Sequence, residues 1–315
     1  MDFDVAIIGG GSAGYAAASS AQALGAKVAI IDPGPLGGLC ILKGCMPTKA
    51  ILRSSDIMAL MRRAKEFGIQ PVDAQAHLSA INDRKNKLIK EFADYRIEQL
   101  NSPRFTLIEE RAQFISPHEI QIGNKLLKAR SFIIATGSVI ANYSVPGLKE
   151  TGFVTSDDIL KMREAPDSII VLGAGAVAVE LAQFLLRIGV KVTLLQRSEH
   201  ILSKGDEDLA RPVESRFREE GMDLYTSTKI LRAEKKPEGS VIYFEHEGKE
   251  KKVLAQYILQ ALGRRPNTDN LQLESAKIET QKSCIPVDSK MKTNQQHIYA
   301  VGDVNGIHEV VHIAI

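Results

Sequence analysis

The sequence has 315 residues, of which 44% are hydrophobic and 25% charged, and its net charge is +2. This composition is ordinary for a globular chain of about two domains and excludes wholesale disorder. The small net charge supplies no reason to bind nucleic acid, and no apolar run reaches the roughly 18 residues of a membrane span. The N-terminus shows no basic, apolar leader, so we expect a cytoplasmic protein.

The N-terminal segment predicts a strand–turn–helix–strand unit. Asp4–Ile8 is a short apolar strand, residues 9–14 form a glycine-rich turn, Tyr15–Leu24 is an alanine-rich helix, and Lys27–Ile31 is a second strand. This order is typical of a dinucleotide-binding βαβ unit.

A loop rich in glycine and proline follows, and after it come two helical stretches, Thr48–Phe67 and about His77–Leu100. From Phe105 to Ala135 the pattern changes to short alternating strands, which predict an antiparallel β-meander. The chain is therefore expected to carry a β-meander insertion within its first domain.

The first unit is then repeated about 165 residues later. Ser168–Leu172 is a strand, residues 173–178 form a glycine turn, Val179–Ile188 is a helix, and Lys191–Leu195 is a strand. A second β-rich stretch, Tyr225–Leu259, mirrors the first meander, and a last strand is expected at 298–301.

The predicted fold class is α/β, with two tandem Rossmann-like nucleotide-binding domains, each with a β-meander insertion. We expect a first domain in two parts, residues 1–147 and 266–315, interrupted by a second domain at 148–265.

The first glycine turn has the spacing G-x-G-x-x-G at Gly9, Gly11 and Gly14. Gly9 permits the tight turn, Gly11 lets a pyrophosphate approach the backbone, and Gly14 allows the helix to pack closely on the strand. Asp32 ends the next strand, where a carboxylate accepts ribose hydroxyls. Because strand, helix and acid are all in place, we interpret the turn as a nucleotide site rather than a turn with packing glycines.

The second turn, Gly173, Gly175 and Ala178, is a G-x-G-x-x-A variant with no acid after the following strand. Gln196 can hydrogen-bond a 2′-hydroxyl, and Arg197 can pair with a 2′-phosphate, although Arg197 is also explained as a solvated surface charge. The pair favours NADPH over NADH, and both remain open.

Cys40 and Cys45 are separated by four residues and lie near the start of a predicted helix, where the helix dipole lowers a thiolate pKa. This spacing suits a redox disulfide. Zinc needs two further ligands, and only Cys284 and scattered histidines remain, so no metal site is expected. Inert buried thiols are the other alternative.

These motifs together resemble the class I pyridine nucleotide–disulfide oxidoreductases, which include dihydrolipoamide dehydrogenase, glutathione reductase and mercuric reductase. Residues 37–49, GGLCILKGCMPTK, match the family's redox signature. Ala135-Thr136-Gly137 resembles its ATG motif, residues 293–303 its second FAD motif, and residues 261–267 its GRxPN stretch.

The resemblance implies that FAD and NADPH or NADH are the cofactors and assigns roles to matching residues. Cys45 is then the flavin-proximal thiol, Cys40 the thiol that attacks substrate, and Lys49 the cation near flavin N5, paired with Glu180. Glu180 is otherwise a helix-surface carboxylate. The residues expected to contact the cofactors are Gly9, Gly11, Ser12, Ala13, Gly14, Asp32, Gly38, Lys49, Ala112, Ala135, Thr136, Gly137, Gly173, Gly175, Ala178, Glu180, Gln196, Arg197, Gly263, Gly302 and Asp303.

Family members carry a C-terminal dimerisation domain that this sequence does not contain. We therefore expect either a piece of a longer, homodimeric protein or a minimal one, and in both cases poor turnover of a disulfide by these residues alone. Ala176 stands where glutathione reductases place a tyrosine, and the presence of Cys40 argues against soluble transhydrogenases.

The acceptor is left open as a small disulfide, as in dihydrolipoamide dehydrogenase, or a metal ion, as in mercuric reductase. A flavin-binding redox module without turnover is the alternative from another class. No nucleic acid or membrane partner is expected.

Overall fold

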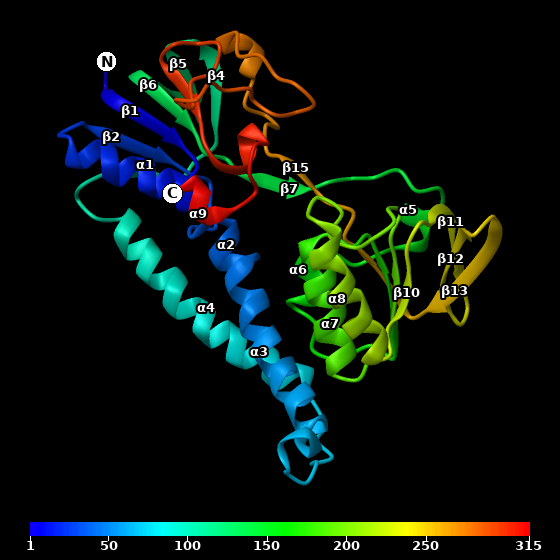
Figure 1. The fold of residues 1–315 in the computed structure, drawn as a ribbon. Helices are drawn as coiled ribbons and strands as arrows, with labels where there is room; N and C mark the ends of the chain where they lie inside the picture. The colour runs from blue at the N-terminus through cyan, green and yellow to red at the C-terminus, as the bar shows by residue number, and fades with distance from the viewer. The chain divides into compact units, whose positions relative to one another are not determined.

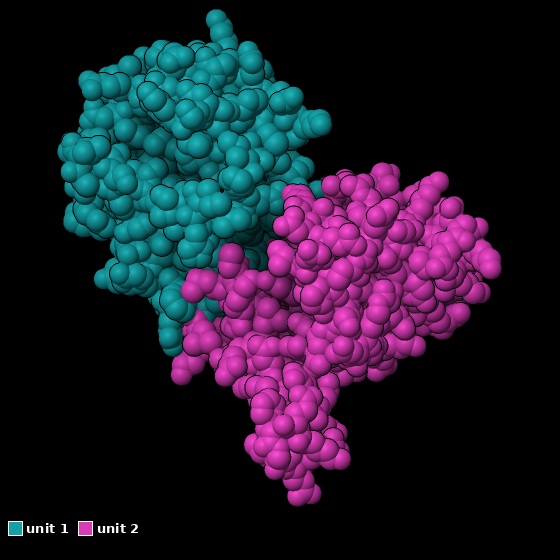
Figure 2. Space-filling view, viewed as in Figure 1, with its two compact units in different colours: residues 1–44, 89–141, 264–315 teal, residues 45–88, 142–263 magenta.

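The computed structural model describes all 315 residues, which form two compact units. Unit 1 comprises Met1–Gly44, Ile89–Ala141 and Arg264–Ile315, and unit 2 comprises Cys45–Leu88 and Asn142–Gly263 (Figure 2). No sequence pattern predicted that residues 45–88 group with the second nucleotide-binding fold. The predicted boundaries at 147/148 and 265/266 stay predictions.

A seven-stranded sheet forms the centre of unit 1, in the order β3-β2-β1-β6-β5-β4, with β16 pairing β6 (Figure 1). Strands β3, β2 and β1, the second half of β6, and β16 pair in parallel in that order, whereas β4, β5 and the first half of β6 form an antiparallel meander. The bounds are β1 Phe3–Ile8, β2 Val28–Ile31, β3 Thr106–Ile108, β4 Ala112–Ser116, β5 Glu119–Ile122, β6 Lys125–Ile134 and β16 Ile298–Ala300.

The alternation of side chains along β1 and β2 gives the sheet two apolar faces. Ile7 and Ile30 pack in one cluster with Ala18 of α1 and with Leu100 of α4, whereas Ile8 and its neighbours pack in the cluster on the other face. The helical elements that follow in the chain are α1 Ser12–Ala23, α2 Gly38–Leu42, α3 Cys45–Arg62, a 3-10 turn Ala64–Phe67, and α4 Leu78–Leu100.

Unit 2 contains a four-stranded parallel sheet in the order β10-β9-β8-β14 and an antiparallel sheet β11-β12-β13. The bounds are β8 Ser168–Leu172, β9 Lys191–Leu195, β10 Asp223–Tyr225, β11 Lys229–Lys236, β12 Gly239–His246, β13 Lys249–Ala255 and β14 Tyr257–Gln260. Its helices are α5 Leu148–Thr151, α6 Ser156–Ile159, α7 Ala176–Arg187 and α8 Glu207–Glu219. Ile51 of α3 joins the core formed by α7, α8 and one face of the parallel sheet.

The predicted fold class is confirmed, because each unit has a parallel sheet with a glycine turn after its first strand and an antiparallel meander. One detail was wrong: residues 106–108 do not belong to the meander but pair in parallel with β2. The long crossover through α2, α3 and α4 allows this parallel pairing, which a hairpin would not.

Four helices were not predicted: α2 at the first cysteine, the short α5 and α6, and the highly charged α8, which contains Pro212. In unit 1, the short strands β7 (Ser138–Ile140) and β15 (Arg264–Pro266) pair antiparallel. A 3-10 turn Gly302–Asn305 and the helix α9 (Val311–Ala314) follow β16. None of the helices combines the length and apolar character required to cross a bilayer.

Candidate functional site

Three distant segments of unit 1 meet at the first glycine turn. A Cβ atom on Gly9, whose φ is +109°, would lie 2.4 Å from the carbonyl oxygen of Ala135. A Cβ atom on Gly38 would lie 2.6 Å from the Cα of Gly11. A Cβ atom on Gly302 would approach the Cβ of Ala13 to 3.4 Å. The predicted FAD segments therefore converge on the start of α1.

The first turn of α1 is open to an anion. Its N-cap, Gly11, makes no side-chain capping hydrogen bond, and no acidic residue lies in the first turn, which contains Ser12, Ala13 and Gly14. Backbone N–H groups at such an end, with the positive end of the helix dipole, favour a phosphate. These residues fit the diphosphate of FAD.

Asp32 is held against the same turn. Its Oδ2 accepts the backbone N–H of Gly10 at 2.6 Å, and its Oδ1 accepts that of Gly34 at 2.8 Å. Each oxygen keeps further lone pairs that can accept from a ribose hydroxyl. The next residue, Pro33, lines a cavity of about 410 Å³ together with Ala112 and Gln113.

The ATG segment of unit 1 is braced by residues from the end of the chain. Thr136 Oγ1 donates to the carbonyl oxygen of Asn267 at 2.7 Å, and the Asn267 N–H donates to the carbonyl oxygen of Gly137 at 2.9 Å. This exchange fixes the turn that Gly137, at φ +70°, allows.

Asp303 lies at the same edge of unit 1, where Ser138 Oγ donates to its Oδ2 at 2.6 Å. Arg264 Nε donates in turn to Ser138 Oγ at 2.8 Å. Sequence reasoning missed Ser138 as the partner of Asp303, and Arg264 as the partner of Ser138. Their positions directly after the ATG motif and after Gly263 were the available signal.

The second glycine turn, in unit 2, repeats the first. Gly173 has φ +96°, and a Cβ atom there would lie 2.6 Å from the carbonyl oxygen of Ala261. Gly175 caps α7 without a side-chain hydrogen bond, and a Cβ atom on it would meet nothing within 4 Å. Ala178 is fully buried against the sheet. The opening above Gly175 suits a second diphosphate.

The two residues after β9 face different surroundings. Gln196 is 6% exposed, and its Nε2 lies 3.3 Å from the carbonyl oxygen of His200 and 3.5 Å from Ser203 Oγ. Arg197 is exposed. The amide of Gln196 is thus engaged inside the unit, and of the two residues only Arg197 faces solvent.

The cysteines lie in two successive helices. Cys40 is half-buried within α2 of unit 1, and Cys45 is the exposed first residue of α3 in unit 2. Thr48 Oγ1 donates to the carbonyl oxygen of Cys45 at 3.1 Å. The pairing of the two cysteines stays a prediction.

Lys49 and Glu180 meet across two helices of unit 2. Lys49 Nζ of α3 lies 2.5 Å from Glu180 Oε1 of α7. The Glu180 side chain is 27% exposed and the Lys49 side chain 59%. Of the residues expected near the flavin ring, these two are 131 apart in sequence and in contact.

A cation near Cys40 was also missed by sequence reasoning. The Arg96 guanidinium of α4 lies 4.2 Å above the ring of Tyr15, and its Nε and Nη1 atoms are buried without a hydrogen-bond partner in the protein. Burial lowers the pKa of Arg96, and the charges of Tyr15, Tyr95 and Cys40, in that order, oppose the shift. Cys40 is thus one of the groups of unit 1 that interact electrostatically with the Arg96 guanidinium.

Comparison with known proteins identifies relatives along the whole chain. The family model described as pyridine nucleotide-disulphide oxidoreductase matches residues 3–315. A mercuric reductase from Staphylococcus aureus is 34% identical over 99% of this chain and 58% of its own length. A dihydrolipoyl dehydrogenase from Bacillus subtilis is 33% identical over 98% of this chain and 69% of its own length.

A solved structure shares the fold. The HOCl-induced flavoprotein disulfide reductase RclA from Escherichia coli superposes with a TM-score of 0.86 at 26% identity, over 99% of this chain and 68% of that one. The chain spans 58% and 50% of the length of two mercuric reductases that it matches, from Staphylococcus aureus and Bacillus cereus.

Proposed function

Because this chain belongs to the pyridine nucleotide-disulphide oxidoreductase family, whose members use FAD and NAD(P)H, we propose that it passes electrons from NAD(P)H through FAD and the Cys40–Cys45 pair to a small disulfide. The observation that carries the proposal is the contact of Lys49 with Glu180. Lys49 lies on α3, four residues after Cys45. A cation held at that place suits a site where negative charge develops.

Bound FAD would accept a hydride from NAD(P)H and transfer the electron pair to a disulfide. Gly9, Gly11 and Gly14 with the start of α1 would hold its diphosphate, and Asp32 its ribose, by the contacts described above. The start of α7 and Arg197 would hold NADPH.

Cys45 and Cys40 perform the exchange. The incoming electron pair breaks the Cys40–Cys45 bond and leaves two thiolates, one on Cys40 in α2 and one on Cys45 at the start of α3. The Cys40 thiolate attacks an external disulfide and releases one thiolate. Cys45 then attacks the Cys40 sulfur, releases the second, and restores the disulfide. Dihydrolipoyl dehydrogenase chemistry is the same sequence reversed.

A mercuric ion is the second candidate acceptor. The Staphylococcus aureus relative is named mercuric reductase, and two neighbouring thiolates are the ligands that a soft metal ion prefers. We also propose that the full protein is a homodimer, which analytical ultracentrifugation of that protein would measure.

The test begins with the FAD-saturated chain, titrated with NADPH without oxygen. We expect a long-wavelength absorbance band from the Cys45 thiolate, retained in Cys40→Ser and lost in Cys45→Ser. An unchanged band in Cys45→Ser overturns the assignment.

The acceptor is identified by NADPH consumption with lipoamide, glutathione disulfide and mercuric ion, with Cys40→Ser as the control for each. Consumption with mercuric ion alone selects the second candidate. The absence of turnover with all three in the full-length protein selects a redox module instead of an enzyme.

A further inference from the structure

Two ion pairs join α3 to α7 in unit 2, and they lie in the same register. Lys49 contacts Glu180, and Asp56 Oδ1 accepts from Arg187 Nη1 at 2.6 Å. In each pair the two partners are 131 residues apart in sequence, so the second pair lies seven residues further along each helix. The two helices are therefore parallel, with a repeat of about two turns between the ion pairs.

The order of charges is reversed between the helices. In chain order α3 presents Lys49 and then Asp56, while α7 presents Glu180 and then Arg187. Sliding α3 by two turns would bring Asp56 to Glu180 or Lys49 to Arg187, and an antiparallel arrangement would create both repulsions. Only the observed direction and register give two attractive pairs.

Arg187 is held in place by contacts within unit 2 other than its contact with α3. Its side chain is 14% exposed, and its Nε and Nη2 donate to the two oxygens of Glu220 at 3.0 and 2.8 Å. Arg216 Nε donates to the same carboxylate at 2.8 Å. Burial alone would raise the pKa of Glu220, but the two guanidinium groups hold it below its ordinary value.

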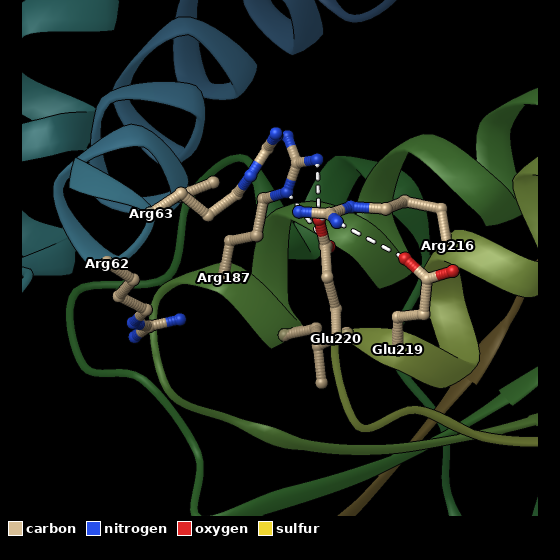
Figure 3. Close-up of a pocket in the computed structure, with 8 residues that line it drawn as sticks. Arg62, Arg63, Arg187, Arg216, Glu219 and Glu220 are labelled. Atoms are coloured by element: carbon tan, nitrogen blue, oxygen red, sulfur yellow. Dashed lines mark hydrogen bonds and ion pairs between the residues drawn. The ribbon is translucent and has the colours of Figure 1, made fainter. Parts of the chain in front are cut away.

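Figure 3 shows Arg187 and Arg216 meeting at Glu220. They line a cavity of about 280 Å³ with Arg62, the last residue of α3, and Arg63, which follows it. The planar guanidinium of Arg187 is thus held rigidly between α7 and the end of α8, and its third nitrogen donates to Asp56.

The exposed Lys49–Glu180 pair alone is too weak to set a register, because solvent screens it. We propose that Arg187 is a positioning residue: through Asp56 it fixes the register of α3 on α7 and so holds Lys49 against Glu180. This inference rests on the proposed function only in giving Lys49 a role near the flavin. Its test measures the contact of Lys49 with Glu180 and not the activity.

The experiment measures acetylation of single lysines by mass spectrometry in the full chain. Asp56→Arg and Asp56→Asn should each raise the modification rate of Lys49 about threefold to fivefold, the range of an exposed ion pair that is lost. Asp56→Glu keeps the charge and should keep Lys49 protected. If Asp56→Arg raises the modification of lysines throughout the chain, it has unfolded the protein, and the milder Asp56→Asn variant then gives the result.

A matched control lies on α4, where Lys90 pairs with Asp94 at 2.5 Å. Asp94→Asn should raise the modification of Lys90 and leave Lys49 unchanged, and the Asp56 variants should do the reverse. Wild-type protection of Lys49 in Asp56→Asn overturns the proposal. The proposed function does not depend on this outcome, because the thiolate band of Cys45 is measured separately.

Discussion

Gly14 packs directly on Gly9, since a Cβ atom added to Gly14 would lie 1.8 Å from the Gly9 carbonyl oxygen. Gly14→Ala should therefore force the helix from the strand and lower the free energy of unfolding by about 3 kcal/mol, the upper range for overpacking. Urea unfolding followed by circular dichroism measures the change.

Gly11→Ala is the matched variant, because its Cβ would find only the Gly38 Cα, at 3.8 Å. It should unfold at nearly the wild-type urea concentration but lose FAD, since the methyl group fills the space of the diphosphate. Equal unfolding midpoints for the two variants would contradict this description of the turn.

Arg197→Glu should weaken NADPH binding by about 10- to 100-fold, the value of a charge-assisted contact with a phosphate, and leave NADH binding nearly unchanged. The expectation follows from the exposure of Arg197 and the internal engagement of Gln196. Fluorescence titration with both nucleotides measures it. Lys191→Glu, at the other end of β9, changes the net charge equally and should spare both affinities.

Glu220→Gln should lower the free energy of unfolding at pH 7 by about 2 kcal/mol, because it breaks charged hydrogen bonds to Arg187 and Arg216. The pKa of Glu220 is lowered in the folded chain, so its contribution is fully present above the ordinary carboxyl pKa. It disappears as the pH falls through the lowered value.

The difference between the Glu220→Gln variant and the wild type should thus shrink in acid, which urea unfolding at pH 7 and about pH 4 would reveal. Glu219→Gln, next to it in sequence but 58% exposed, should cost less than about 1 kcal/mol. A larger loss in Glu219→Gln than in Glu220→Gln is the contrary result.

Arg96→Met should move alkylation of Cys40 to higher pH, because a half-buried positive charge near the thiol is removed. The measurement uses iodoacetamide with Cys45 and Cys284 replaced by serine. Arg96→Lys retains the charge and should retain most of the effect. Identical pH profiles in all three proteins would show that Arg96 does not act on Cys40.

The local elements were largely readable from the sequence, and the pairings less so. The bounds of β8 and β9 were predicted to the residue, because each is an apolar run closed by a turn. The direction in which residues 106–108 pair was not, since strand composition does not distinguish parallel from antiparallel neighbours.

The candidate site divides in the same way. The glycine turns and Asp32 follow from local spacing. The Lys49–Glu180 contact was expected only through a family resemblance, and the Asp56–Arg187 contact was not expected at all. Both join residues 131 apart, and no periodicity within one helix specifies which distant helix it will face.

The convergence of Gly9, Ala135 and Gly302 at the start of α1 has a consequence for synthesis. The first βα turn leaves the ribosome early, but its partner Ala135, directly after β6, follows more than a hundred residues later, and Gly302 later still. Contacts of such high sequence separation form slowly and late. The nascent chain therefore cannot complete the contacts around the first glycine turn until nearly all of these 315 residues have been translated.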